Sequence, residues 1–414
     1  MKRKAMRPFW VGMVYSAFLL TSYSVPGSIT IRAATLLVLL VFAGFCAQTF
    51  VKLSGLSWGL VSVLYFSAML VWASLPAAVT ALDLGGLSHF EYLGFGVGGL
   101  LMGATFAAYL LHWKEIHRLN LFLVSIIIPF IIINLIFLWG SAPGTSQFNG
   151  VFRDRNYFAF YSVALVWLSH FGEWRRSTHL LMRVPLLLFV LLSGSVGGLL
   201  MLLLYALWRA KRRLHQLSSA RRMIVAVVFI ALLPISVTLY PIIPAAQRVG
   251  PWVEFLMSRE APETGSSAIR RLHQASEGLR VALENPLTGV GYGSAQYVIQ
   301  TLPRWPEPYS LHNTYLEIWA GAGIAPLTVF LSGLFWAAFR SFNCRWCKRR
   351  GVPVMIMMTA VFLGSYSALH RFGPMFFLGA ALALAFGVRQ ELATDEQGLQ
   401  GNYSPRAQYC KKSI

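Results

Sequence analysis

His312, Asn313 and Glu317 place polar side chains at the start of an otherwise apolar stretch, LHNTYLEIWAGAG (311–323). A neutral imidazole is well suited to accept a proton near pH 7, and a neighbouring amide or carboxylate can orient it or its substrate. We therefore take His312 as a candidate general base, with Asn313 and Glu317 in support. The alternative is a histidine with a purely structural role at the start of a helix.

Arginines supply the complementary chemistry. The stretch FRDRNYFAFY (152–161) places two arginines and Asn156 around Asp154 where an apolar run begins, and further arginines lie in 265–286. Guanidinium groups make forked hydrogen bonds to phosphate oxygens and keep their charge, and the free N–H groups of a helix start also attract anions. The alternative for 152–161 is interfacial anchoring, with Asp154 as a helix N-cap. The candidate phosphate-binding residues are Arg153, Arg155, Arg270, Arg271, Arg280 and Arg371, and they need no metal ion or cofactor.

The elements that must position these residues are membrane helices. The chain is 56% hydrophobic and only 12% charged, and apolar runs such as 33–51 and 223–240 are long enough to cross a bilayer. Composition therefore predicts an all-α polytopic membrane protein. The basic, then apolar, N-terminal segment lacks a small-residue cleavage site, which favours a retained first helix over a signal peptide.

The net charge of +20 is distributed by side rather than gathered for a nucleic acid. With the N-terminus taken as cytoplasmic, every lysine falls in a loop on the cytoplasmic side, and the opposite loops carry arginine alone. This asymmetry follows the positive-inside rule and predicts cytoplasmic termini, with membrane lipids and not nucleic acid as surroundings. Arginine-rich codon usage is the other explanation for the absence of lysine from the outer loops.

We predict about twelve spans, because an even number keeps both basic termini on one side. The stretch 180–208 has arginines at both ends, so a single crossing would break the charge rule. Two helices joined at SGSVGG (193–198) satisfy it. The other spans are expected at about 9–25, 33–51, 57–80, 91–112, 119–139, 157–172, 223–240, 313–339, 352–369 and 374–388.

The only long stretch that is not apolar, 241–308, predicts a periplasmic loop containing an amphipathic helix over about 267–284. Ser266 or Ser267 would cap its start, and Asn285-Pro286 would end it. Its apolar residues recur at helical spacing and should face the membrane-embedded body, while the opposite face bears charge or meets solvent. The apolar set is Ile269, Leu272, Ala275, Leu279 and Leu283; the polar set is Arg270, His273, Glu277 and Arg280, with Arg271 at the border.

This topology predicts one integral membrane domain over 1–414 with a cytoplasmic tail at 389–414. It also brings four polar segments to the same side of the membrane: 152–161, 193–198, the loop helix and 312–317. GVGYGS (289–294) has no strand before it and is interpreted as a turn. The cysteines of CRWC (344–347) lack further metal ligands nearby and are expected to be reduced and incidental.

Three of these segments resemble the O-antigen ligase and polymerase superfamily. HNTYLEIWAGAGIAP (312–326) is similar to the ligase signature, with His312, Asn313 and Gly323 at matching positions and Pro326 departing from it. RRLHQASEGLRVALENPLTGVGYG (270–293) resembles the arginine-containing segment that precedes it, and FRDRNYFAFYSVAL (152–165) resembles a stretch that opens a middle helix. One departure is Val196, which stands where family members often carry arginine.

The resemblance implies a membrane-embedded glycosyltransferase of the GT-C type in the bacterial inner membrane, with its site facing the periplasm. It would invert the anomeric configuration without a metal ion, moving O-antigen glycan from an undecaprenyl diphosphate donor to lipid A-core. The alternative within the family is a polymerase whose acceptor is another lipid-linked glycan. A transporter or flippase for lipid-linked sugars is a third reading, disfavoured because ionisable residues are scarce in the middle of the spans.

Overall fold

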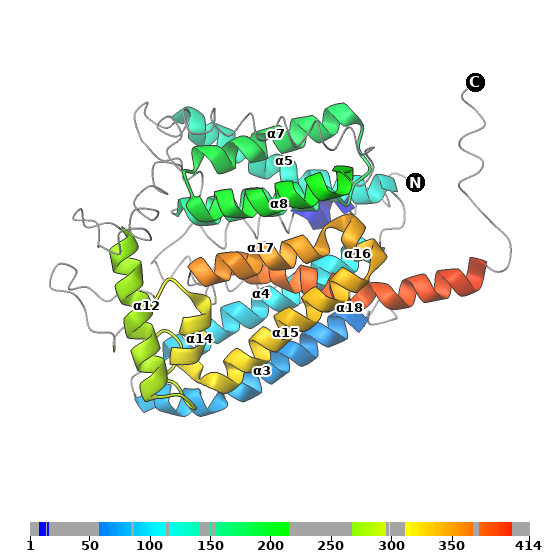
Figure 1. The fold of residues 1–414 in the computed structure, drawn as a ribbon. Helices are drawn as coiled ribbons and strands as arrows, with labels where there is room; N and C mark the ends of the chain where they lie inside the picture. Colours follow the sequence, from blue (N-terminus) through cyan, green and yellow to red (C-terminus); the bar gives the residue numbers. More distant parts are fainter. Residues whose placement is uncertain are drawn as a thin grey trace, which may run out of the picture.

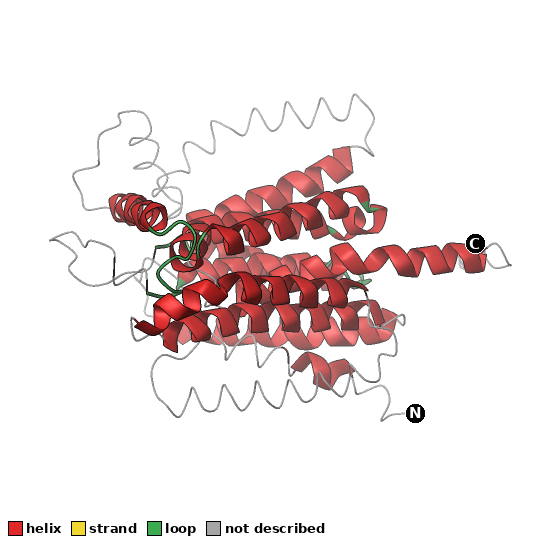
Figure 2. Cartoon of the chain, turned by 90° about the horizontal axis from the view of Figure 1, so that it is seen from below, coloured by secondary structure: helices red, strands yellow, loops and turns green. Residues whose placement is uncertain are grey.

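The computed structural model describes residues 8–13, 15, 58–83, 87–112, 116–140, 150, 152, 154–214, 267–294, 298, 311–366 and 372–399. All regular secondary structure within these ranges is helical (Figures 1 and 2). Among the described residues, three helices are long and apolar enough to cross a membrane, namely Gly59–Ala78, His117–Trp139 and Ile324–Asn343. The protein is a helical membrane protein. The predicted spans at 33–51 and 223–240, and most of 9–25, lie outside the described residues.

Most of the predicted spans in the described ranges correspond to helices. α3 (Trp58–Asp83), α4 (Leu87–His112), α5 (Ile116–Gly140) and α6 (Arg155–Leu168) follow in chain order, and α17 (Val352–Ser365) and α18 (Phe372–Leu399) come near the end. α18 continues well past the predicted span at 374–388. The first part of the predicted tail is therefore helical.

The expected break in 180–208 is confirmed. α7 (Arg176–Leu192) and α8 (Val196–Leu214) are separate helices, and Gly194 turns the chain between them with φ 59°. The Ser193 hydroxyl accepts a hydrogen bond from the main-chain N–H of Ser195 at 3.2 Å, which closes the turn. The charge rule thus located a helix end inside a continuous apolar run.

The expectation of one span over 313–339 was wrong. The chain forms a short α14 (Thr314–Ala322) and then α15 (Ile324–Asn343), followed by α16 (Arg345–Arg350). Gly323 breaks the helix with φ 88°, and a Cβ there would lie 2.0 Å from the carbonyl oxygen of Leu287. The N–H of Ile324 donates instead to the carbonyl of Pro286 at 2.8 Å, so the preceding loop ends α14.

The loop helix is present as α12 (Ser267–Glu284), but its predicted buried face was wrong. Leu279 and Leu283 are exposed, whereas Gln274 and Val281 are fully buried. Gly278 explains the difference, because a Cβ at this position would lie 2.5 Å from a methyl group of Leu311. Small residues let α12 approach α14 more closely than the leucines would allow.

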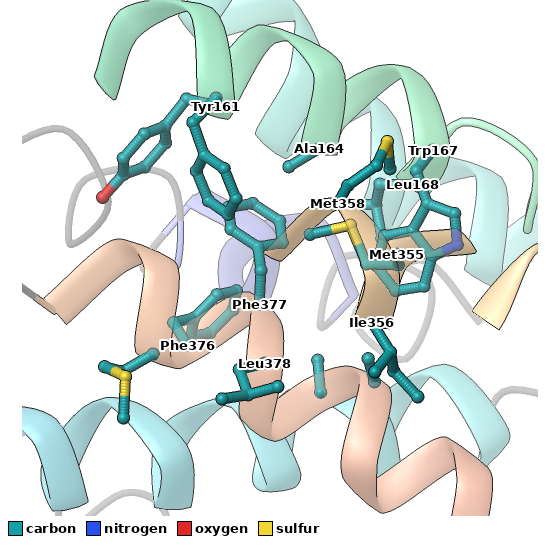
Figure 3. Close-up of a cluster of buried hydrophobic side chains, with 14 of the residues drawn as sticks. Tyr161, Ala164, Trp167, Leu168, Met355, Ile356, Met358, Phe376, Phe377 and Leu378 are labelled. Atoms are coloured by element: carbon teal, nitrogen blue, oxygen red, sulfur yellow. The ribbon is translucent and has the colours of Figure 1, made fainter. Parts of the chain in front are cut away.

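α6 lies at the centre of the described bundle. Every residue from Asn156 to Leu168 is buried. Figure 3 shows its side chains meeting those of α17 and α18, with Tyr161 and Trp167 facing Phe377 and Met355. α18 packs in turn on α4, where small residues allow the backbones to approach: a Cβ at Gly103 would lie 1.8 Å from the carbonyl oxygen of Phe376.

The helices α8, α15 and α17 run roughly side by side, and α12 crosses one end of this group (Figure 1, left). Figure 2 shows α12 along its own axis, outside the ends of the long helices. α16 lies at the opposite end (Figure 1, right). The molecule therefore presents two ends, and the polar segments predicted to do chemistry belong to the end with α12 and α14.

Candidate active site around Tyr366

His312 stands just before α14 in a constrained backbone conformation. Its φ of 51° makes it the one non-glycine residue with positive φ among those that the structure describes. Such a conformation costs about 1–3 kcal/mol and is typical of functional sites. The next residue, Asn313, caps α14 by accepting hydrogen bonds from the N–H groups of Tyr315 and Leu316 at 3.0 and 3.1 Å. The cap fixes the point at which His312 leaves the helix.

Tyr366, which ends α17, connects His312 with Arg271 of α12. The guanidinium carbon of Arg271 lies 5.1 Å from the centre of the Tyr366 ring, and its Nη2 donates to the phenol oxygen at 3.5 Å. The His312 ring meets the same ring edge-on, with centroids 6.5 Å apart and planes at 89°. The candidate base and one candidate phosphate ligand thus share one aromatic side chain.

Further contacts join Tyr366 to the other polar segments. The hydroxyl of Thr314 donates to the main-chain carbonyl of Tyr366. The Tyr157 ring of α6 lies 6.2 Å from the Tyr366 ring, and a Cβ at Gly197 of α8 would lie 3.4 Å from it. Tyr366 therefore touches or closely approaches α6, α8, α12 and the start of α14.

Asn156 and Ser195 tie the start of α6 to the turn before α8. The Ser195 hydroxyl donates to Oδ1 of Asn156 at 2.7 Å and accepts from the N–H of Gly198 at 3.0 Å. Asp154 caps α6 by accepting from the N–H and from the side-chain amide of Asn156, both at 2.7 Å. Segments 152–161 and 193–198, predicted to lie on one side, are in direct contact.

The loop 285–294 holds α14 in place. The N–H groups of Val290 and Gly291 donate to the carbonyls of Ala320 and Gly321 at 2.9 and 2.7 Å. A Cβ at Gly289 would lie 2.4 Å from the N atom of Ala322, so the glycine allows this close contact. The prediction that GVGYGS is a turn is confirmed. Its structural effect is to attach α12, and hence Arg271, to α14, which begins two residues after His312.

Glu317 lies on a different side of the site from His312. Its side chain is buried, and its charge acts on Tyr292, whose hydroxyl is hydrogen-bonded with that of Ser74 of α3 at 3.2 Å. Burial raises the pKa of Tyr292, the Ser74 bond opposes this, and the Glu317 charge adds to the rise. Because the known effect of the carboxylate is on Tyr292, we assign Glu317 to the packing of α14 rather than to His312.

The structure does not bring Arg280 to Tyr366. Arg280 lies nine residues from Arg271, half a turn away on an α-helix, and it pairs with Glu277 and Glu284 at 3.0 and 2.7 Å. The side chains of Arg153, Arg270 and Arg371 lie outside the described residues.

Two side chains, one on α6 and one on α12, have buried polar atoms without a described partner. Nη1 of Arg155 and both side-chain amide atoms of Gln274 are shielded from solvent and have no hydrogen-bond partner among the described residues. Gln274 lies one helical turn from Arg271 on the buried face of α12. A desolvated donor or acceptor without a partner costs about 1–3 kcal/mol, so these atoms are suited to a polar substrate.

Comparison with known families shows which proteins part of the chain is similar to. Residues 181–331 match the family model described as O-antigen ligase. The match covers less than half of the chain, and it supports membership of the O-antigen ligase and polymerase superfamily. Among curated proteins, no match was found. At the level of the family, the match supports a ligase- or polymerase-like membrane glycosyltransferase.

The matched region contains most of α7, all of α8, α12 and α14, and the first part of α15, and so includes Arg271 and His312. Tyr366 lies beyond it. Sequence reasoning also missed Tyr366, because its neighbourhood, GSYSALH, carries no motif. The one available signal was its position at the junction of the last two apolar runs, on the side where the other polar segments were expected.

Proposed function

We propose that this protein is an O-antigen ligase that transfers glycan from an undecaprenyl diphosphate donor to a hydroxyl of lipid A-core. The observation that carries the proposal is the shared contact of His312 and Arg271 with Tyr366. A proton acceptor and a permanent cation that contact one ring suit a reaction that removes a proton from the acceptor and releases a diphosphate from the donor.

In the proposed step, the acceptor oxygen attacks the anomeric carbon and gives its proton to His312. The bond between that carbon and the diphosphate oxygen breaks, and its electron pair leaves with the polyprenyl diphosphate. Attack from the side opposite the leaving group inverts the anomeric configuration. His312 then releases its proton to water, which returns the site to its starting state.

Arg271 is assigned to the leaving diphosphate, whose negative charge grows as the bond breaks. A preorganised cation at that position stabilises the transition state more than the ground state. Arg155 is a second candidate, because its buried Nη1 has no partner among the described residues. Arg153, Arg270 and Arg371 remain proposed ligands, and one of them would supply the cation that family members place where this chain has Val196.

The test is transfer by purified protein in nanodiscs, with undecaprenyl diphosphate-linked glycan as donor and lipid A-core as acceptor. We expect His312→Ala to lower the rate by about 10²–10⁴-fold, the usual contribution of a general base. His117→Ala, at an exposed histidine of α5, should not change it. Activity should persist in EDTA. Normal transfer by the His312 variant would refute the assignment.

A deletion strain separates ligation from polymerisation. Loss of every O-antigen band from lipopolysaccharide, with the core intact, is the expected result. Bands that carry a single repeat unit would instead identify a polymerase, whose acceptor is another lipid-linked glycan. Movement of the lipid-linked glycan across the membrane of liposomes that contain the protein, with no glycan transfer in nanodiscs, would instead identify a transporter.

A further inference from the structure

A cluster of basic side chains lies at the other end of α6 from Asn156. It is formed by the residues that follow α6, the first half of α7, the last turns of α8, and α16. α6 has 14 residues, so this cluster lies about 21 Å along the helix from the Tyr366 site. The proposed glycosyl transfer uses none of its residues.

His170 is the centre of the cluster. Nη2 of Arg183 lies 2.9 Å from its Nδ1, and its Nε2 lies 2.7 Å from the Tyr205 hydroxyl. A guanidinium group can only donate, so Nδ1 accepts and the proton of the neutral ring is on Nε2. Nε of Arg183 also donates to the Ser169 hydroxyl at 2.8 Å. Arg183 is therefore held in one orientation at the end of α6.

The imidazole carries no charge here. Its Nδ1 accepts from the Arg183 guanidinium, which a protonated ring could not do. Because the ring stays neutral, the positive charge of the cluster resides on guanidinium groups.

Arg350 and Arg212 are ordered by hydrogen bonds to main-chain carbonyls, and the carboxylate of Glu173 acts on Arg350. Nη1 of Arg350 donates to the main-chain carbonyls of His170 and Phe171 at 2.6 and 3.1 Å. Nη1 of Arg212 donates to the carbonyl of Arg349 at 2.6 Å, and its guanidinium lies 5.4 Å from the Trp208 ring centre. Neither these two nor Arg209 forms an ion pair with a residue in the described ranges. Each keeps further N–H donors for an anion.

Apolar side chains continue from this cluster along both neighbouring helices. On α7, Leu180 and Val184 are 55% and 45% exposed; on α8, Leu203 and Leu207 are 50% and 55% exposed. Val184 directly follows Arg183, and Leu207 comes two residues before Arg209. A ligand that fits both features has a phosphate next to long hydrocarbon chains.

We propose that Arg209, Arg212 and the ordered Arg183 bind the headgroup phosphate of an anionic diacyl phospholipid, whose acyl chains lie along α7 and α8. Basic pockets between membrane helices bind lipids of this kind. The positive-inside rule accounts for the number of cations here. It does not explain why the side chains of Arg183, Arg212 and Arg350 are held in fixed orientations by hydrogen bonds.

The experiment compares thermal unfolding of the purified full chain in nanodiscs of phosphatidylcholine with and without phosphatidylglycerol. We expect phosphatidylglycerol to raise the unfolding midpoint by about 4 °C, as a bound ligand does. The double variant Arg209→Gln/Arg212→Gln should lose this shift. The matched control Arg345→Gln/Lys348→Gln removes the same charge from exposed positions of α16 and should keep it.

Native mass spectrometry should show the phospholipid retained by the wild type and by the control but not by the double variant. Should that variant fail to fold in phosphatidylcholine, the single Arg209→Gln change takes its place. Equal loss in both double variants would overturn the proposal in favour of general surface charge. A shift produced by inorganic phosphate alone would overturn the lipid in favour of a free anion. If phosphatidylglycerol does not raise the unfolding midpoint of the wild type, the proposed lipid site does not exist.

Discussion

Tyr366 holds Arg271 in two ways that differ in strength. The hydroxyl contact at 3.5 Å is at the limit of a hydrogen bond, whereas the guanidinium carbon lies 5.1 Å from the ring centre, well within the range of a cation–π interaction. The ring also meets His312. The aromatic face, more than the phenol oxygen, should therefore position both groups.

Two substitutions separate these contributions. We expect Tyr366→Phe to reduce glycan transfer by less than about threefold and Tyr366→Leu by more than about tenfold, because only leucine removes the ring. The measurement is kcat and KM for the lipid-linked donor, with unfolding temperatures as a check on the fold. A greater loss with phenylalanine than with leucine would contradict this account.

Arg271 is expected to need its planar, forked group and not only its charge. Arg271→Lys keeps the cation but loses paired donation and stacking on Tyr366, so we expect transfer to fall by more than about tenfold. Arg280→Lys is the matched control on the opposite face of α12, where two glutamates of the same helix hold the side chain. Equal effects of the two substitutions would remove Arg271 from the site.

The sequence was enough to select candidate residues, but it did not indicate which residues contact them in the fold. His312 and Arg271 could be selected from the sequence, because imidazole and guanidinium are uncommon in apolar surroundings. Tyr366 could not, because a tyrosine between two apolar runs has many ordinary roles. Its importance depends on contacts with residues more than 50 positions away, which only the packing of α12, α14 and α17 creates.

At the scale of elements, the break between α14 and α15 is the feature most sensitive to one methyl group. Gly323→Ala would place its Cβ against the Leu287 carbonyl at an unfavourable φ, and we expect a loss of about 3 kcal/mol in stability. Gly94→Ala in α4 is the control, since a Cβ there meets nothing within 4 Å. Thermal unfolding in detergent measures both. A stable Gly323 variant would mean that the loop does not hold α14.

The junction of α15 and α16 predicts one reactive thiol. Hydrogen bonding from the Cys347 thiol is the main cause that lowers the pKa of Cys344 to about 6, while Cys347 is buried and its own pKa is raised. The thiolate of Cys344 should therefore predominate above pH 6. We expect its iodoacetamide labelling, followed by mass spectrometry, to reach half its maximal rate near pH 6.

Cys347→Ala provides the comparison, because it removes the side-chain donor to the Cys344 sulfur. The midpoint should then rise toward that of an ordinary thiol. Labelling of Cys344 with a midpoint above pH 8 in the unaltered protein would disprove the shift.

Element boundaries followed from the sequence wherever charge or capping marked them. Arginines at both ends of 180–208 predicted the break between α7 and α8, and the serines and Asn-Pro bounded α12. The buried face of α12 could not be predicted, because hydrophobicity favoured Leu279 and Leu283. Close packing favoured Gly278 instead, which brings α12 against Leu311. The break at Gly323 depends on its contact with the loop at Leu287, which the hydrophobic periodicity of the sequence cannot predict.

At the scale of the whole molecule, the Tyr366 site and the basic cluster around His170 lie at the two ends of one short helix, α6. α6 and α17 have 14 residues each, about 21 Å, whereas the hydrocarbon core of a bilayer is about 30 Å thick. Tilting α6 only reduces the distance that it spans along the membrane normal. At least one cluster must therefore lie beneath the plane at which the hydrocarbon begins.

A site at that depth should respond weakly to salt. Mobile ions screen exposed charges beyond about 10 Å at 0.1 M but reach recessed pairs poorly. We expect the KM for the lipid-linked donor to change by less than about threefold between low and high NaCl. A steep rise of KM with salt would place the diphosphate in open solvent.

The brevity of α6 also bears on how strongly opposite charges attract at its ends. Two unit charges 4 Å apart attract by about 1 kcal/mol in bulk water but by about 4 kcal/mol where the effective dielectric constant is near 20. A guanidinium group that meets a phosphate below the headgroups works in the second regime. A short α6 therefore strengthens the attraction between a guanidinium group and a phosphate without any additional cation.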